Sequence, residues 1–292
     1  MTVSPDLLRI LGQVAGGEST IQEAAETLMQ TTSLGAAWQG TVAGACVDLG
    51  RQQRCGFPEV VFGEGKSSEL ICEIVQTQLA AGQSALVTRL DPASATQVRR
   101  CFQHACHNPI ARTLRVAAES ITPAAATESA DRSGRPYAAV ITAGSTDSPV
   151  AEEATETLAW MEVPYLRIDD VGVAGPQRLL SAADRLTGAA AVVVIAGLEG
   201  ALPAAVAGHV SCPVFAVPSS VGYGISLGGI TPLLGMLSSC AANVSVVGID
   251  AGFKGGYLAG MVTRRLIDCL PEDGRKTVVA PETSVAPTLE SS

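Results

Sequence analysis

Five apolar runs occupy the C-terminal half of the chain, and each is separated from the next by a segment of helical length. In chain order they are YAAVITAG, PYLRID, AAAVVVIAG, CPVFAVP and VSVVGID. Short, almost wholly apolar strands that alternate with helices are typical of a parallel sheet covered on both faces. The C-terminal half is therefore predicted to be a three-layer, doubly wound α/β fold.

The N-terminal part has a mixed α/β pattern that is less regular. Short strands are expected in ACVDLG, EVVFG and SALVTRL, and a helix in SSELICEIVQTQLAAG. The segment ESITPAAATESADRSGRP lacks an apolar period and is rich in small and polar residues, which predicts a linker. The predicted organisation is a smaller N-terminal α/β domain over 1–118, a linker over 119–136, the doubly wound domain over 137–270 and a flexible tail over 271–292.

Several helix starts are marked by side chains that can accept hydrogen bonds from free backbone amides. Ser19 precedes the first clear helix, and Ser67 or Ser68 precedes the helix in the N-terminal domain. Asp91 is followed by Pro92, and Ser148 is followed by another proline, the residue that favours the first helical position. These residues are predicted to cap their helices.

The charge balance bears on partners and compartment. The chain has 19 basic and 28 acidic residues and a formal charge of −9, which repels phosphate backbones and anionic membrane surfaces. Neither nucleic acid nor a membrane is therefore an expected partner.

The first 30 residues carry charges throughout and show no basic start followed by an apolar core, and the eight cysteines lack paired CxxC spacing. A cytoplasmic protein with reduced thiols is expected.

A stretch of 50 residues, from Gly200 to Ile249, contains no Asp, Glu, Lys or Arg. Prolines at positions 203, 213, 218 and 232 interrupt it before a run of about 20 helical apolar residues can form. The stretch is therefore predicted to form buried core and an interface between subunits rather than a membrane span.

Polar residues and glycines follow each of the five predicted strands. In an open parallel sheet the carboxyl ends of the strands line the ligand crevice, so these residues are predicted to form one site. Each of them taken singly could equally cap a helix or turn the chain. The candidate residues are Ser145, Thr146, Asp147, Asp170, Gly172, Gly197, Glu199, Ser219, Ser220 and Asp250.

The first of these strand ends suggests the kind of ligand. Ser145, Thr146 and Asp147 stand at a strand-to-helix junction, where free amides and hydroxyls suit an anion and a carboxylate suits ribose hydroxyls. A phosphorylated ribose would satisfy both. No GxGxxG follows the first strand, which weakens the alternative of a dinucleotide-dependent dehydrogenase.

Five blocks, in order over about residues 48–259, carry a family resemblance. They are DLGRQQRCGFPEVVFGEGK, DDVGVAG, AGLEGALP, VPSSVGYGISLGGITPLLGMLSSCA and GIDAGFKGGYLA, and together they resemble the LarB family, the pyridinium-3,5-biscarboxylic acid mononucleotide synthases of nickel-pincer cofactor synthesis. AGSTDSPVAEEATETL also resembles the opening of the phosphoribosyl-aminoimidazole carboxylase fold. That carboxylase is the poorer match, because its catalytic His would fall near Ala201, where this chain has none.

The resemblance implies a reaction on nicotinic acid adenine dinucleotide: carboxylation of the pyridinium ring by CO2 or bicarbonate, and hydrolysis of the phosphoanhydride with release of AMP. Cys240 matches the family's nucleophilic cysteine and Glu199 its carboxylate, which implies covalent catalysis with a carboxylate base. From the residues alone, Cys240 is interpreted as a packed core thiol. Mg2+ is expected for the hydrolysis, with Asp147, Asp170 and Asp250 as candidate supports, although no ligand spacing defines a metal site.

Two further segments are candidates for ligand contact. The block VPSSVGYGISLGG could wrap phosphates or stack on a ring, or form only a flexible turn; it adds Gly222, Tyr223 and Gly224 to the candidate binding residues. Lys66, with two arginines nearby, could meet a diphosphate, although such charges are more often solvated surface. The string CFQHACH holds Cys and His but is expected on a helix, where its side chains diverge, so no zinc site is predicted.

The position of Cys240 predicts a shared site. It follows the apolar segment ITPLLGMLSS, near a helix C-terminus that in a doubly wound sheet faces away from the crevice. A site formed between subunits removes this difficulty, and the related folds assemble as octamers, so a homo-octamer is expected. Two alternatives to the LarB function remain: a purine-type aminoimidazole ribonucleotide carboxylase or mutase, and a sensing module that binds a nucleotide without transforming it.

Overall fold

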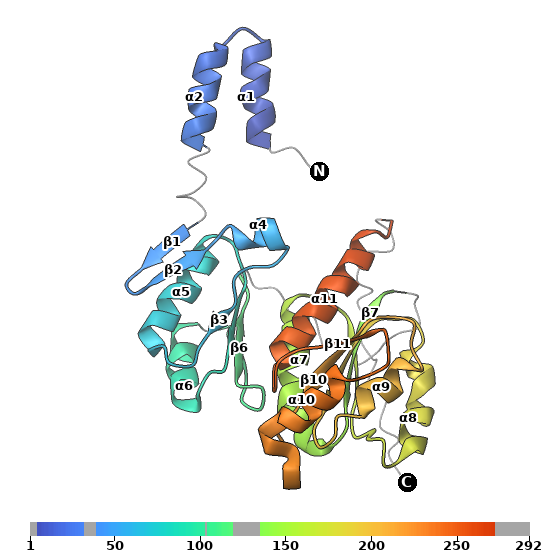
Figure 1. The fold of residues 1–292 in the computed structure, drawn as a ribbon. Coiled ribbons are helices and arrows are strands. Elements are labelled where there is room, and N and C mark those ends of the chain that lie inside the picture. Colours follow the sequence, from blue (N-terminus) through green and yellow to red (C-terminus); the bar gives the residue numbers. More distant parts are fainter. Residues whose placement is uncertain (1–4, 32–38, 103, 119–134, 272–292) are drawn as a thin grey trace, which may run out of the picture.

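The structure is a computed structural model that describes residues 5–31, 39–102, 104–118 and 135–271 (Figure 1). Most of the predicted linker, residues 119–134, and nearly all of the predicted tail, residues 272–292, lie outside the described residues. The domain boundaries stay a prediction. No helix in the described ranges combines the length and the apolar character that a membrane crossing requires.

The five apolar runs form one parallel sheet, as predicted. In spatial order its strands are β11, β10, β9, β7 and β8, and each pairs in parallel with its neighbours. β7 and β9, at the centre, are almost completely buried. The strand bounds are Tyr137–Thr142 for β7, Tyr165–Ile168 for β8, Ala189–Ala196 for β9, Val214–Pro218 for β10 and Val244–Val246 for β11.

Helices cover both faces of this sheet (Figure 1). On one face lie α7 (Ser148–Trp160) and α11 (Gly252–Asp268). On the other lie α8 (Pro176–Ala183), α9 (Leu202–Ala207) and α10 (Ile230–Leu237). A side chain at Gly256 would bring its Cβ to 2.6 Å from the Ala154 carbonyl oxygen, so a glycine is needed where α11 crosses α7. The three-layer, doubly wound prediction is confirmed.

The N-terminal part forms the smaller α/β unit that was expected. A four-stranded sheet has the order β3 (Val61–Phe62), β4 (Ala85–Thr88), β6 (Thr113–Val116) and β5 (Cys106–Asn108), and β1 (Gln39–Val42) pairs with β2 (Ala45–Asp48). Its helices are α4 (Arg51–Cys55), α5 (Ser68–Ala80) and α6 (Pro92–Cys101). α1 (Pro5–Ala15) and α2 (Ile21–Thr31) precede them.

The predicted caps divide into two that are confirmed and two that are wrong. Ser67 accepts a hydrogen bond from the Leu70 amide, and Asp91 accepts two at the start of α6. At α2 it is Thr20, not Ser19, that caps, because its hydroxyl accepts from the Glu23 amide while the Glu23 carboxylate accepts from the Thr20 amide.

Ser148 does not cap α7, since Asp147 occupies the capping position and no capping bond forms there. The Ser148 hydroxyl instead accepts from Arg167, 2.8 Å away. The string CFQHACH is not one helix: α6 ends at Cys101, and Cys106 lies in β5. Its paired sheet position overrides the helical pattern.

Candidate functional site

The turns after β7, β10 and β11 meet at the carboxyl edge of the sheet. The Asp147 carboxylate accepts from the Gly144 amide at 3.0 Å and from the hydroxyl of Ser219, and both Asp147 and Ser219 are buried. The Asp250 carboxylate accepts from the Ser220 amide at 2.8 Å. Four of the predicted site residues are thus brought together from three separate strand ends.

The two carboxylates of this cluster influence each other. Burial raises the pKa of the Asp147 carboxyl above its ordinary value, and the nearby Asp250 charge adds to the rise. Hydrogen bonds from Ser219 and Gly144 oppose it. Paired acceptors at the end of a parallel sheet suit the hydroxyls of a bound sugar.

Asp147→Asn is expected to raise the free energy of unfolding more at about pH 8 than at about pH 4.5. A carboxyl whose pKa is raised in the folded state contributes stability below its unfolded-state pKa, and that stability is lost as the pH rises through the folded-state pKa. The wild type therefore carries an unfavourable buried charge at the higher pH, and the amide removes it. Denaturant titration at the two pH values measures the effect, with exposed Asp184→Asn as control. An equal or larger gain at the lower pH would contradict the prediction.

A cation that the sequence reasoning missed lies at the end of β8. Arg178 Nη1 is 2.7 Å from Asp170 Oδ2, and both side chains are about half exposed. A Cβ on Gly175 would lie 2.8 Å from Arg178 Nε, so the guanidinium lies against the small-residue turn VGVAG. The same turn holds Gly172, where a Cβ would lie 2.8 Å from the Ala143 carbonyl oxygen. An arginine just past a glycine turn was a signal available in the sequence.

The turn after β9 is held tightly between two neighbours. A Cβ on Gly197 would lie 2.2 Å from the Val221 carbonyl oxygen, and one on Gly235 of α10 would lie 2.5 Å from the Glu199 carbonyl oxygen. The Glu199 side chain itself is exposed. The close packing fixes the backbone at Glu199, while the Glu199 carboxylate lies on the surface.

Left-handed backbone concentrates at the same edge. Asp170, Leu198 and Asp250 have φ values of +58°, +51° and +53°, and each follows a strand of the parallel sheet. Residues other than glycine adopt this conformation at a cost, and such residues cluster at functional sites. The observation supports a ligand site at the carboxyl edge.

The segment from Val221 to Leu237 exposes a series of large apolar side chains. Tyr223 is 82% exposed, and Gly224 beside it has φ +63°. Exposed apolar side chains that follow one another along a segment are typical of interaction surfaces. The exposed apolar side chains are Val221, Tyr223, Ile225, Leu227, Ile230, Leu234 and Leu237, and this set is called the apolar surface below.

Cys240 lies away from the carboxyl-edge cluster. It is exposed, so its interpretation from the residues alone as a packed core thiol is wrong. It stands in the connection from α10 to β11, which enters the sheet at the amino end of β11. Among the hydrogen bonds and ion pairs of the described residues, none joins Cys240 to Glu199 or to another predicted site residue.

Lys66 follows β3 in the N-terminal unit, where its Nζ donates to the Phe62 carbonyl oxygen at 2.9 Å. The Gly63 amide donates to the Thr88 carbonyl oxygen, so the turn that carries Lys66 lies beside the end of β4. From that end Arg89 reaches the Asp250 carbonyl oxygen. Lys66 therefore follows the strand next to β4, and Arg89 at the end of β4 is the residue that contacts the carboxyl edge directly.

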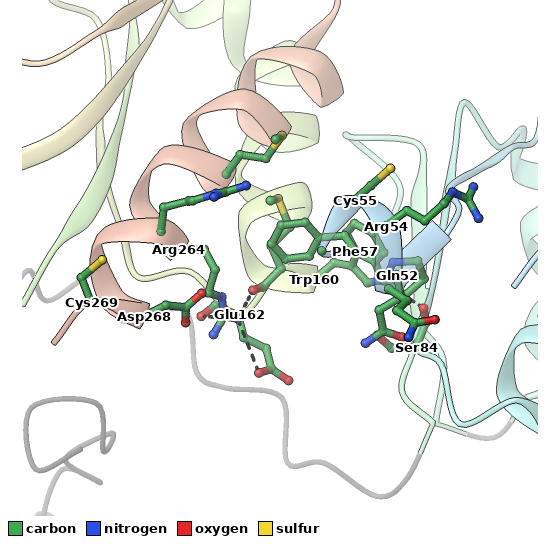
Figure 2. A pocket seen from close by; sticks show the side chains of 16 residues that line it. Gln52, Arg54, Cys55, Phe57, Ser84, Trp160, Glu162, Arg264, Asp268 and Cys269 are labelled. Atoms are coloured by element: carbon green, nitrogen blue, oxygen red, sulfur yellow. Dashed lines mark hydrogen bonds and ion pairs between the residues drawn. The ribbon is translucent and has the colours of Figure 1, made fainter. Parts of the chain in front are cut away.

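A cavity of about 700 Å³ lies elsewhere, between α4 and the helices α7 and α11 (Figure 2). Phe57 and Trp160 line it with ring centroids 6.0 Å apart, and Arg264 and Glu162 line it as well. Arg54, one of the two arginines near Lys66 in the sequence, lines this cavity and pairs with Asp48. None of the predicted catalytic or substrate-binding residues lines it.

The carboxylates expected to support Mg2+ are engaged with other partners. Asp147 accepts from Gly144, Asp250 accepts from Ser220, and Asp170 pairs with Arg178. Across the described ranges, no group of three or more His, Cys, Asp or Glu side chains is placed to hold a metal ion. Within the part of the chain that the structure describes, these three carboxylates do not converge on one position, and Mg2+ stays an expectation.

Two family models match the chain. Residues 40–118 match the LarB/PurE-like N-terminal domain, and residues 138–273 match AIR carboxylase. An uncharacterized protein of Methanocaldococcus jannaschii is 36% identical over 225 residues, which cover 75% of this chain and 83% of the relative. The chain belongs to the LarB family.

The C-terminal half of this LarB-family chain is thus an AIR carboxylase domain, and the chain is a member of a carboxylase family. Among solved structures it is similar to the crystal structure of a PurE2 variant from Treponema denticola. The two share 19% sequence identity and a TM-score of 0.37, over 48% of this chain and 84% of that one.

Proposed function

We propose that this LarB-family protein carboxylates the pyridinium ring of nicotinic acid adenine dinucleotide and hydrolyses its phosphoanhydride. The products are pyridinium-3,5-biscarboxylic acid mononucleotide, the first intermediate of nickel-pincer cofactor synthesis, and AMP. Membership of the LarB family carries the proposal. The sequence resemblance supports it, since Cys240 and Glu199 match the family's nucleophile and carboxylate, and Ala201 stands where the purine carboxylase would need His.

The chemistry needs a nucleophile, because a pyridinium cation cannot itself attack CO2. The Cys240 thiolate adds to ring C4 and converts the ring into an electron-rich enamine, so that C5 attacks CO2 and forms the new C–C bond. Glu199 then takes the proton from C5, the electron pair restores the aromatic ring, and the C4–S bond breaks to release the thiolate. Water attacks the phosphoanhydride in a separate step that gives the mononucleotide and AMP.

The carboxyl edge offers the groups that hold such a substrate. The amides and hydroxyls of Ser145 and Thr146, just after β7, suit a phosphate, and the paired acceptors Asp147 and Asp250 suit ribose hydroxyls. Arg178 adds a cation that can exchange its exposed Asp170 partner for a phosphate. The remaining proposed binding residues are Lys66, Gly172, Gly197, Ser219, Ser220, Gly222, Tyr223 and Gly224.

The position of Cys240, in the connection that enters the sheet at the amino end of β11, favours a site shared between subunits. The apolar surface lies on the segment that links β10 to β11, and α10, which carries part of it, leads directly to Cys240. Burying this surface against a second copy would remove large apolar side chains from water and could bring one subunit's Cys240 to another's Glu199. A homo-octamer is the proposed assembly.

The test is incubation with nicotinic acid adenine dinucleotide, bicarbonate and Mg2+. The proposed enzyme releases AMP and adds one carboxylate to the ring, both of which mass spectrometry of the products detects. Binding without turnover would overturn the proposal in favour of a nucleotide sensor. Carboxylation of aminoimidazole ribonucleotide, with none of the dinucleotide, would favour the purine-type carboxylase or mutase.

A further inference from the structure

Arg89 links the N-terminal sheet directly to the carboxyl edge of the other sheet. It follows β4, and its Nε donates to Glu153 Oε1 at 3.1 Å while its Nη2 donates to the Asp250 carbonyl oxygen. Its backbone is left-handed, with φ +53°, and the Arg112 guanidinium donates to its carbonyl oxygen. A left-handed backbone costs free energy at a residue other than glycine, so the contacts around Arg89 must hold it in this conformation.

The partner carboxylate is buried beneath this contact. The Glu153 side chain is only 4% exposed, and it also accepts from the Phe253 amide at 3.0 Å. Burial raises the pKa of Glu153, and the charge of Arg89 opposes the rise. Removal of Arg89 would therefore leave a buried charge without its cation.

The backbone that Arg89 holds belongs to the proposed site. Asp250 has φ +53°, its amide donates to the Pro218 carbonyl oxygen, and its carboxylate accepts from the Ser220 amide. The turn is therefore contacted at two points: Arg89 donates to the Asp250 carbonyl oxygen, and Glu153 accepts from the Phe253 amide. The two contacts therefore flank the backbone that carries the Asp250 side chain.

Two other polar contacts between the units lie on α7 instead. Arg115 pairs with Glu156 on α7 at 2.5 Å, and Asn108 donates to Glu152 and Glu156 on the same helix. These contacts hold the units together through α7. Arg115 is therefore a matched control for Arg89: it also extends from the N-terminal unit to α7, but it does not contact Asp250.

We propose that Arg89 is a positioning residue, through which the N-terminal domain holds the Asp250 turn in the geometry that binds the sugar-phosphate of the substrate. The identity of that substrate rests on the proposed function. The positioning itself is a property of the turn and is measurable without substrate.

The test compares Arg89→Met with Arg115→Met in the full-length protein. Arg89→Met is expected to raise KM for nicotinic acid adenine dinucleotide about 10- to 100-fold with little change in kcat, because a displaced turn weakens binding. Arg89→Lys should recover part of the loss. Arg115→Met should change neither constant. Equal effects of the two Met variants, or an unchanged KM in Arg89→Met, would overturn the proposal.

Hydrogen exchange separates this proposal from the proposed function. Without substrate, the amides of Ser220 and Phe253 should exchange faster in Arg89→Met and at the wild-type rate in Arg115→Met. If the wild type turns over no dinucleotide, the proposed function fails while faster exchange still supports the positioning. Unchanged exchange at both amides would overturn the positioning whatever the substrate.

A second variant covers the case in which Arg89→Met does not fold. In Arg89→Met/Glu153→Gln the buried charge is gone, and the Gln amide oxygen can still accept from Phe253. This variant should fold and still show faster exchange at Ser220, because the contact with the Asp250 carbonyl remains absent. Wild-type exchange at Ser220 in this variant would overturn the proposal.

Discussion

Cys240→Ser is expected to lower the rate of ring carboxylation at least about 1000-fold while the protein folds and assembles as the wild type does. A serine hydroxyl is a far weaker nucleophile than a thiolate toward the pyridinium ring. The substitution is nearly isosteric, and Cys240 is exposed, so little packing is lost. The measurement is release of carboxylated product in a stopped assay, with circular dichroism as the check on folding.

Cys269→Ser is the matched control, because Cys269 is also exposed and follows the end of α11. It should retain full activity. The intact mass of wild-type protein mixed with the dinucleotide should include a sulfur-linked adduct that Cys240→Ser lacks. Unchanged product formation by Cys240→Ser would remove the nucleophile assignment.

Leu234→Asp is expected to dissociate the assembly and to lower turnover at least about 100-fold. Leu234 lies on α10 within the apolar surface and is 58% exposed in the single chain. A carboxylate there stays solvated in an isolated subunit but would be buried in a subunit interface, where an unpaired charge is strongly unfavourable. Loss of the neighbour would also remove the Cys240 that the shared site requires.

Leu180→Asp provides the control, since Leu180 is 59% exposed but lies on α8, outside the apolar surface. Sedimentation velocity should give the wild-type mass for Leu180→Asp and a smaller species for Leu234→Asp. Mixed assemblies of Cys240→Ser and Glu199→Gln chains should recover part of the activity. A wild-type mass and full activity for Leu234→Asp would contradict the shared site.

The arrangement of the C-terminal sheet could be predicted from the sequence because its signals are local. Five apolar runs separated by helical segments allow few arrangements other than a parallel sheet covered on both faces, and the structure has that sheet. The caps at Ser67 and Asp91 were likewise predictable from neighbouring residues. The string CFQHACH misled because sheet pairing, a tertiary effect, overrides its helical pattern.

The candidate site was predictable only where it follows from the ends of strands. Asp147, Ser219 and Asp250 converge because parallel strands end at one edge. The sequence places Arg178 three residues after Gly175, yet only the folded structure shows that the Arg178 guanidinium lies against Gly175.

Apolar periodicity and the residues that end each strand predicted the sheet, its two covered faces and the edge that carries the polar cluster, because neighbouring residues in the sequence carry these signals. The tertiary structure alone decided which distant groups meet. Arg89 reaches a backbone oxygen 161 positions away and a buried carboxylate 64 positions away, and Cys240 is carried to the side of the sheet where β11 begins. Such contacts depend on how whole elements pack, and no local pattern of residues encodes that packing.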